Sequence, residues 1–193
     1  MKKFLFLILI TFVTGNIFAQ EAKYFDVDNK EISKKYFEEK RSTNSVLDIL
    51  EDKNNHHKLI DRDDKGNIKD IEALISKIKN VTKKTLSPNK PIVIIYYPGE
   101  DPCNSGGDTK SVSKRYKDLE HTTAKANFIY IYKDHKGLEK FGNDIMWIKD
   151  PEQTIEKLFF KHHYPCSSFV VISKNGITLV ILASFQTNMC VML

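Results

Sequence analysis

Six consecutive apolar or aromatic residues, IVIIYY at positions 92–97, place the strongest constraint on the fold of this chain. The run is short, is rich in β-branched and aromatic side chains, and lies between Pro91 and Pro98. A strand that is buried on both faces has this composition, whereas a strand with one solvated face alternates apolar and polar residues. The run therefore predicts a central strand in a sheet that is covered on both sides.

The segments around this strand alternate between helical and strand patterns. Apolar residues recur at three- and four-residue spacing from Ile68 to Val81 and from Thr109 to Lys125, which predicts two helices. The other predicted elements are a helix from Asp150-Pro151, a turn at 63–66, and strands at 56–60, 127–132, 169–172 and 177–183. From residue 90 onward the order is β-α-β-α-β-β. This order predicts an α/β sandwich with a mixed central sheet flanked by helices.

The first nineteen residues have the pattern of a secretory signal peptide. Lys2 and Lys3 precede a nearly continuous apolar stretch from Phe4 to Val13, and a small residue, Ala19, precedes Gln20. A basic start, a short apolar stretch and a small residue before the cleavage point are the parts of such a signal. The mature protein is therefore expected to be periplasmic or secreted. No membrane span is expected after signal cleavage, because no later segment is sufficiently long and apolar.

Three regions are expected along the chain: a signal peptide at 1–19, an N-terminal extension at 20–55 and an α/β domain at 56–193. The extension is short and polar, with a strand predicted near 23–27. A helix is predicted after the capping residue Ser33, and a second short helix from Thr43 to Leu50. The remaining length suits one globular domain.

The charge distribution argues against a nucleic-acid partner. The formal charge of +5 falls to +3 when the two lysines of the signal peptide are removed. Acidic and basic residues are interspersed, and this mixing is typical of a solvated surface rather than of a basic binding face. No cofactor is expected, because the loop after the central strand lacks the GxxxxGK[ST] spacing of a phosphate-binding loop. The partner is unspecified, with another exported protein as its expected class.

Two segments resemble the thioredoxin-like family. Lys90-Pro91 leads the central strand into a cysteine-containing loop (KPIVIIYYPGEDPC), and Tyr164-Pro165 precedes the predicted hairpin (YPCSSFVVISKNG). The resemblance covers roughly residues 56–186. It implies a thioredoxin-like sandwich in which Pro165 is a cis-proline beside the active loop.

The Cys-x-x-Cys pair of that family is not preserved. On the alignment that the resemblance implies, Glu100 occupies the place of the attacking thiol, and only Cys103 is kept. Dithiol exchange needs an attacking and a resolving thiol, and the carboxylates of Glu100 and Asp101 disfavour a thiolate nearby. The resemblance therefore implies a degenerate member without a catalytic dithiol.

The chain contains three cysteines, Cys103, Cys166 and Cys190. In an oxidising compartment they permit one bridge and one spare thiol, and Cys190 has no evident partner. If Pro165 lies beside the loop, as the resemblance implies, Cys166 approaches Cys103 closely enough for a disulfide. The alternative is that Cys103 is a buried apolar side chain. Cys103, Cys166 and Pro165 are the candidate site residues if the pair is redox-active.

Residues Asp61 to Glu72 partly match an EF-hand calcium loop. Asp61, Asp63 and Glu72 fall at loop positions one, three and twelve, where oxygen ligands are needed, and Gly66 falls at the turn position. Lys65 opposes the match, because it replaces the oxygen donor of position five. A strand, a turn and a helix in succession are the alternative for this segment.

These observations favour one function and leave two alternatives. The favoured function is an exported thioredoxin-like binding or structural domain without a catalytic dithiol. Its interaction surface is expected to combine Pro98 to Gly107 with Tyr164 to Cys166. The first alternative is an envelope thiol-disulfide oxidoreductase that uses Cys103 and Cys166, and the second is a calcium-binding module at Asp61 to Glu72. No enzymatic activity is expected unless the cysteine pair is redox-active.

Overall fold

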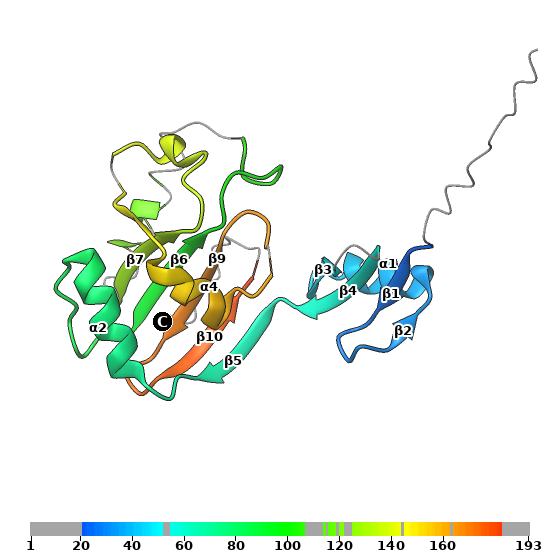
Figure 1. The fold of residues 1–193 in the computed structure, drawn as a ribbon, viewed down its shortest axis with the longest axis horizontal. Coiled ribbons are helices and arrows are strands. Elements are labelled where there is room, and N and C mark those ends of the chain that lie inside the picture. The colour runs from blue at the N-terminus through cyan, green and yellow to red at the C-terminus, as the bar shows by residue number, and fades with distance from the viewer. Residues whose placement is uncertain are drawn as a thin grey trace, which may run out of the picture.

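The computed structural model describes residues 21–51, 55–106, 114, 116–118, 120–121, 125–143, 145–162 and 164–182. The predicted signal peptide at 1–19 lies outside these residues. Within them the chain is mixed α/β, as predicted, with a four-stranded and a six-stranded sheet and several helices (Figure 1). Each sheet contains both parallel and antiparallel strand pairs.

The six-stranded sheet has the order β5-β10-β9-β6-β7-β8. Its strands are β5 (Asp63–Asn67), β6 (Ile92–Tyr97), β7 (Asn127–Tyr132), β8 (Trp147–Lys149), β9 (Ser168–Ile172) and β10 (Ile177–Ile181). Strands β6, β7 and β8 run parallel, β9 is antiparallel to β6, and β10 is antiparallel to both β9 and β5. The predicted central strand, the strand at 127–132 and the hairpin are therefore confirmed.

Strand β6 is buried along its whole length, as its composition predicts. Ile94 and Tyr96 belong to a core that includes residues of α2 (Ile71–Thr82) and α4 (Thr154–Phe159). Ile95 and Tyr97 belong to a second core. Because successive residues of a strand point to opposite faces, this one strand contributes to the cores on both sides of the sheet.

The helices on the first face begin with aspartate caps. Asp70 accepts a hydrogen bond from the Ala73 N–H at 2.9 Å and begins α2, the first predicted helix. Asp150 accepts from the N–H groups of Ile155 at 3.0 Å and Glu156 at 2.8 Å, after the 3-10 turn η3 (Pro151–Gln153). The third predicted helix therefore begins one turn later than its sequence pattern indicates. Most of the second, at 109–125, lies outside the described residues.

Residues before Arg62 form a folded module, not a polar extension. Its elements are β1 (Lys23–Phe25), β2 (Glu31–Ile32), α1 (Lys34–Ser42), β3 (Val46–Glu51) and β4 (His56–Asp61), with the sheet order β2-β1-β4-β3. Ser33 caps α1, as predicted, by accepting from the Tyr36 N–H at 3.3 Å. Phe37, Val46 and Leu59 form a small core. Strand β4 pairs with β1 and β3, so the module extends beyond the boundary expected at residue 56.

Two local predictions are wrong. The helix expected at 43–50 is largely strand β3, whose Leu47 and Ile49 pack into the first core of the large sheet. The turn expected at 63–66 is part of strand β5, which pairs along its whole length with β10. Strand β3 pairs with the next strand, β4, and β5 pairs with the distant β10. In both cases strand pairing overrides the local preference.

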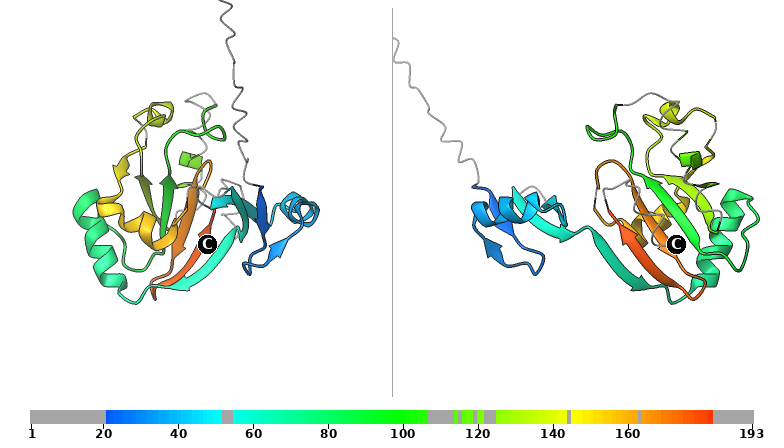
Figure 2. Two further views of the ribbon diagram at one scale, coloured as in Figure 1. Left: turned by 45° about the vertical axis from the view of Figure 1, so that its right-hand side comes forward. Right: turned by 180° about the vertical axis from the view of Figure 1, so that it is seen from behind.

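Strands β4 and β5 carry the chain from one sheet to the other, with only Arg62 between them. Figure 2 shows the four-stranded module set to one side of the larger body, at the beginning of β5. Among the residues that the structure describes, no helix has the length and apolar character needed to cross a membrane.

Candidate functional site

The loop at 98–106 leaves the end of the central strand and meets the chain that leads into β9. Tyr96 of β6 pairs with Ser168, the first residue of β9. The loop that follows β6 and the segment that precedes β9 therefore lie at the same end of the sheet. Pro98 and Gly99 are buried, whereas Pro102 and Cys103 are exposed. The sheet register therefore brings two segments more than sixty residues apart to one surface.

The structure brings Cys103 and Cys166 together at disulfide-bonding distance. Their Cα atoms are 5.1 Å apart across a sequence separation of 63, inside the limit of about 7 Å that a bridge requires. Cys103 is exposed and Cys166 is half-buried. The alternative in which Cys103 is a buried apolar residue is therefore wrong.

Pro165 lies next to the cysteine pair, but its peptide bond differs from the expectation. No cis peptide bond occurs among the described residues, so the Tyr164–Pro165 bond is trans, and the predicted cis-proline is wrong. The unusual backbone lies one residue later, where Cys166 has a φ of 68°. A non-glycine residue in this left-handed region is uncommon, so the local turn is held by its surroundings.

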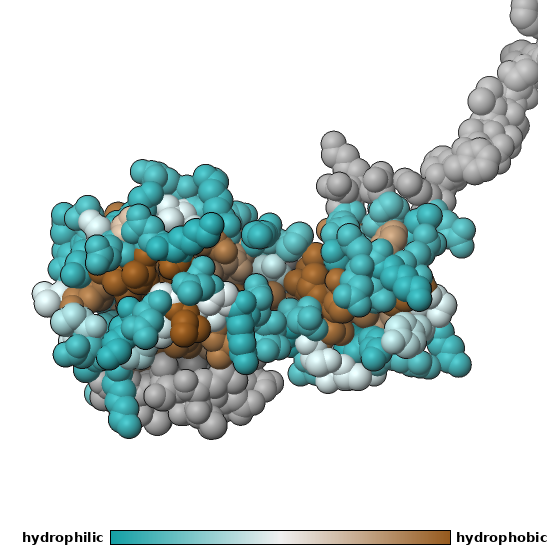
Figure 3. Space-filling model, turned by 90° about the horizontal axis from the view of Figure 1, so that it is seen from below, coloured by the Kyte–Doolittle hydropathy of each residue, from teal (hydrophilic) through white to brown (hydrophobic). Residues whose placement is uncertain are grey.

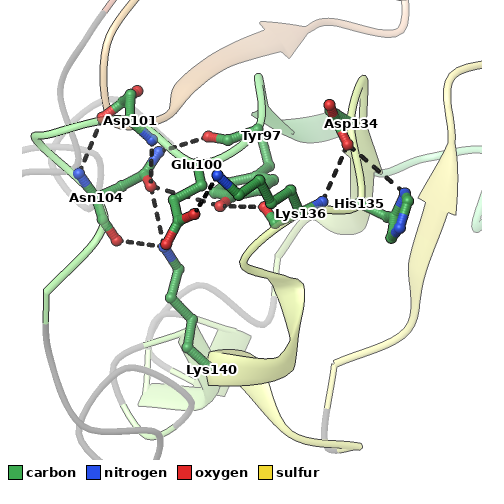
Figure 4. Close-up of polar contacts among 9 residues, drawn as sticks. Tyr97, Glu100, Asp101, Asn104, Asp134, His135, Lys136 and Lys140 are labelled. Carbon is green, nitrogen blue, oxygen red and sulfur yellow. Dashed lines mark hydrogen bonds and ion pairs between the residues drawn. The ribbon is translucent and has the colours of Figure 1, made fainter.

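The carboxylate of Asp101 accepts hydrogen bonds from the backbone on both sides of the disulfide. Figure 4 shows Asp101 beside Asn104, with Lys140 reaching the same loop. The Oδ1 of Asp101 accepts hydrogen bonds from the N–H groups of Cys103 at 2.8 Å and Asn104 at 2.9 Å. Its Oδ2 accepts from the Cys166 N–H at 2.9 Å. Asp101 is itself buried, with an exposed fraction of 9%. One carboxylate thus binds the backbone at both cysteines.

Asn104 completes the connection between the two segments. Its side-chain amide donates to the carbonyl oxygens of Gly99 at 2.8 Å and Cys166 at 3.0 Å. Its Oδ1 accepts from the Asp101 N–H at 3.1 Å and from Lys140 Nζ at 3.1 Å. Lys140 also donates to the Asn104 carbonyl oxygen. The loop is therefore fixed by side chains from three parts of the chain.

Lys140 lies over aromatic rings as well as against the loop. Its Nζ is 5.0 Å from the ring centroid of Tyr97 and 5.5 Å from that of Phe141. Burial lowers the pKa of Lys140, and the nearby carboxylates of Glu100 and Asp101 act in the opposite direction. The ammonium group is directed to Asn104 and the rings, so its contribution is to hold the loop.

The loop that contains Lys136 and Gly137 packs against the site through Tyr97 and Glu100. Tyr97 donates its hydroxyl proton to the Lys136 carbonyl oxygen at 2.9 Å. Gly137 has a φ of 81°, and a Cβ at this position would lie only 2.6 Å from the Tyr97 hydroxyl. Lys136 Nζ forms an ion pair with Glu100 at 3.0 Å, on the exposed side of the loop. The carboxylate of Glu100 is thus paired with a lysine.

From the sequence, Asp101 is expected only as a negative charge, Asn104 only as part of the surface from Pro98 to Gly107, and Lys140 not at all. A local signal for Asp101 does exist, because an aspartate before Pro-Cys-Asn is typical of a turn in which the side chain accepts backbone N–H groups. The contacts of Asp101 with Cys166 and of Asn104 with Lys140 span long sequence separations. No local pattern predicts them.

The calcium candidate does not form a loop in the structure. Asp61 ends β4, Asp63 begins β5, and Glu72 lies in the first turn of α2. Extended strands carry Asp61 and Asp63, so the chain does not curl around one point as an EF-hand loop must. The part of the chain that the structure describes contains no group of three or more aspartate, glutamate, histidine or cysteine side chains arranged to hold a metal ion.

Comparison of the chain with models of protein families, with curated proteins and with solved structures gives no match. The function is therefore inferred from the geometry of the cysteine loop and its surroundings. In chemical terms, that geometry supplies an exposed disulfide, a buried carboxylate bound to the backbone on both sides of it, and a lysine held by Asn104.

Proposed function

We propose that the protein is an exported, thioredoxin-like binding domain without a catalytic dithiol. Its interaction surface consists of the loop at 98–106 and the segment from Tyr164 to Cys166, named here the disulfide surface. The thioredoxin-like assignment is supported by the Lys90-Pro91 lead into the central strand β6 and by the position of Tyr164-Pro165 before the β9–β10 hairpin. A disulfide is compatible with an oxidising compartment, which supports export.

The observation that carries this proposal is the carboxylate of Asp101 bound to the backbone N–H groups of Cys103 and Cys166. These hydrogen bonds to a buried side chain hold the two segments together, while Cys103 and Pro165 remain exposed. Exposed loops on a fixed scaffold are where proteins commonly bind partners. The disulfide surface combines a fixed backbone with exposed side chains, as a binding surface needs.

The same carboxylate argues against the oxidoreductase alternative. Reactive cysteines lie in electropositive surroundings that favour the thiolate, whereas the buried Asp101 places a negative charge at both cysteines. The half-buried Lys140 is bonded to Asn104 rather than to either cysteine. A disulfide in such surroundings is expected to be hard to reduce, because the reduced state gains little from ionisation.

A redox titration distinguishes the proposed binding function from the oxidoreductase alternative. We expect the purified protein to keep its Cys103–Cys166 bridge in glutathione buffers, with a midpoint below about −300 mV, as structural disulfides do. We also expect it to reduce insulin no faster than buffer with the same reductant. A midpoint near those of cellular oxidoreductases, together with insulin turnover, would show that the oxidoreductase alternative is correct.

Site-specific photo-cross-linking tests the binding surface. A photoreactive residue at the exposed Ser105 is expected to form a cross-link to one exported protein in cells that make the protein. The same residue at the exposed Glu39 of α1 is the matched control and is expected to give no such product. Equal products at both positions, or none at Ser105, would contradict the assignment of the surface.

A further inference from the structure

Four loops meet at the end of the six-stranded sheet that lies opposite the disulfide surface. Strand β6 begins there at Ile92, which pairs with Asn127, the first residue of β7, and with Ile172, the last residue of β9. Figure 1 shows the β9–β10 turn and the connection from β5 to α2 at this lower end of the large body. Because β6 is six residues long, this end lies about 20 Å from the disulfide surface. The described residues of the four loops are 68–70, 83–91, 125–126 and 173–176.

These loops, named here the lysine end, contain six lysines and one acidic residue. The lysines are Lys69, Lys83, Lys84, Lys90, Lys125 and Lys174, and all except the half-buried Lys84 are exposed. The acidic residue is Asp70, whose carboxylate caps α2 by accepting the Ala73 N–H at 2.9 Å. Glu72 and Lys79, in the first and last turns of α2, balance each other in charge. Although acidic and basic residues are interspersed along the sequence, the fold therefore gathers lysines from four separate segments.

Hydrogen bonds between the loops and the sheet fix the lysine end. The side-chain amide of Asn127 donates to the carbonyl oxygens of Ser87 at 3.0 Å and Lys90 at 3.1 Å, and its Oδ1 accepts from the Ser87 N–H at 2.9 Å. The Ile68 N–H donates to the Gly176 carbonyl oxygen at 2.9 Å. The backbone that carries the lysines is therefore held in a defined position relative to the strands.

The charges of the lysine end are paired less than those near the disulfide surface. There, Lys133 forms an ion pair with Glu156 at 2.6 Å, and Lys136 forms one with Glu100 at 3.0 Å. Four lysines of the lysine end form no ion pair with any described residue, namely Lys69, Lys83, Lys125 and Lys174. The positive charge of the lysine end is therefore available to an external anion.

The lysines are spread across the end of the sheet and do not surround a ligand pocket. Their loops extend from β5 to β7, over four strand spacings or about 19 Å. The cavity beside Lys84 has a volume of about 290 Å³, at the lower limit of small-molecule sites. Glu120 also lines this cavity and disfavours an anion inside it. An extended anionic surface fits this distribution better than a single small anion.

Two large apolar side chains are exposed beside the lysines. Ile177, at the start of β10, is 58% exposed and follows the turn that contains Lys174. Val81, in the last turn of α2, is 38% exposed and lies two residues before Lys83. Figure 3, seen from below, shows hydrophilic side chains on the large body with smaller hydrophobic areas between them. Lysines together with exposed apolar side chains are typical of proteins that bind the surface of a membrane.

From these observations we propose that the lysine end binds the surface of a membrane that contains anionic lipids. The lysines lie against the lipid phosphates, and Ile177 and Val81 enter the boundary between the headgroups and the acyl chains. Strand β6 then leads away from the membrane, so the disulfide surface at its other end faces away from the lipid. The presentation of that surface to a partner rests on the proposed function, whereas the membrane binding does not.

The proposal is tested by flotation of the purified exported protein with lipid vesicles. One set of vesicles is phosphatidylcholine alone, and the other contains equal parts of phosphatidylcholine and phosphatidylglycerol. We expect at least about tenfold tighter binding to the anionic vesicles at low salt, and weaker binding as salt rises. Equal binding to the two sets, or no binding to either, would overturn the proposal without the use of any variant.

Paired charge variants locate the membrane-binding surface. Lys83→Gln/Lys174→Gln is expected to weaken binding to the anionic vesicles about tenfold to thirtyfold, because each lysine near such a surface contributes about fivefold. Lys34→Gln/Lys35→Gln removes the same charge from exposed positions on α1 and is expected to leave binding unchanged. Equal losses in the two double variants would show that net charge alone, and not the lysine end, determines binding.

An apolar variant separates a membrane from a soluble polyanion. Ile177→Ser is expected to weaken the vesicle binding that remains at high salt, and Leu50→Ser, at a position 62% exposed on β3, is its control. Tight binding of dextran sulfate, together with an Ile177→Ser variant that binds vesicles like wild type, would identify a soluble polyanion as the ligand and overturn the membrane assignment. None of these results bears on the disulfide surface, because that surface is tested by the redox and cross-linking measurements.

Discussion

Asp101 accepts a hydrogen bond from the N–H of Cys166 at 2.9 Å, although the two residues are 65 positions apart in the sequence. The other oxygen of the same carboxylate binds the Cys103 N–H at 2.8 Å. The two cysteines are thus linked twice, once through their sulfur atoms and once through a buried carboxylate. The loop after the central strand therefore has a noncovalent connection to β9 that does not depend on the disulfide.

Replacing the carboxylate tests this connection. Asp101→Asn keeps the size of the side chain but removes the acceptor for one of its backbone donors, and an unsatisfied buried donor costs about 1–3 kcal/mol. We expect the free energy of unfolding in urea to fall by this amount, and the disulfide to become easier to reduce. Glu100→Gln is the control, because its exposed ion pair with Lys136 contributes at most about 1 kcal/mol. Equal losses in the two variants would contradict the role of Asp101.

Removal of the disulfide has a separate expected cost. In the chain-entropy treatment, a bridge that closes a loop of this length stabilises the folded state by about 4 kcal/mol. Cys103→Ser/Cys166→Ser is therefore expected to lower the urea midpoint strongly, while α2 and the central sheet still form by circular dichroism. A double variant as stable as the oxidised wild type would contradict a structural role for the bridge.

The central sheet was predictable because its signals are local. A few neighbouring residues are enough to predict three of its parts, namely the strand at 92–97, the strand at 127–132 and the hairpin turn at Asn175-Gly176. The cap of α1 at Ser33 is local in the same way. Patterns of this kind predicted the mixed α/β class and the positions of four strands of the six-stranded sheet, β6, β7, β9 and β10.

The edge strand and the details of the site depend on distant residues. The sequence DDKGN of β5 has the composition of a turn, and it becomes a strand because every residue pairs with β10 more than a hundred positions later. Likewise, the support of Asn104 by Lys140 exists only after folding. The cysteine pairing came from the resemblance, since three cysteines alone do not specify a partner.

Two neighbouring tyrosines give opposite expectations for the same substitution. Tyr97 donates a hydrogen bond to the Lys136 carbonyl oxygen, whereas the buried hydroxyl of Tyr96 has no hydrogen-bond partner among the described residues. Tyr97→Phe is therefore expected to cost about 0.5–1.5 kcal/mol. Tyr96→Phe is expected to be neutral or stabilising, because it removes a buried polar group without a partner. Urea denaturation of both variants measures the difference, and a larger loss for Tyr96→Phe would contradict it.

The same tyrosines predict how stability changes in alkali. Burial raises the pKa of Tyr96 and Tyr97 above the ordinary value, with smaller contributions from Glu156 and Glu100, respectively. Their stabilisation is fully present below about pH 10, the unfolded value, and is lost above it as the unfolded chain ionises. We expect each Phe variant to lose stability less steeply than wild type between pH 9 and pH 11. Parallel pH profiles for wild type and both variants would contradict this linkage.

Asp150 provides the corresponding test in acid. Burial raises the pKa of its carboxyl group, although hydrogen bonds from Ile155 and Glu156 act in the opposite direction. Because the folded-state pKa is raised, the favourable linkage is present below about pH 3.9 and is lost as pH rises through the folded value. Asp150→Asn has one backbone acceptor fewer than the ionised carboxylate, but it does not carry this pH-dependent cost. The stability of Asp150→Asn relative to wild type is therefore expected to improve from pH 3 to pH 7, as measured by urea denaturation.

Asp70→Asn, at the exposed cap of α2, is the control and shows the effect of replacing a capping carboxylate without burial. A relative stability of Asp150→Asn that is constant or declines with rising pH would show that the hydrogen bonds outweigh burial at this position.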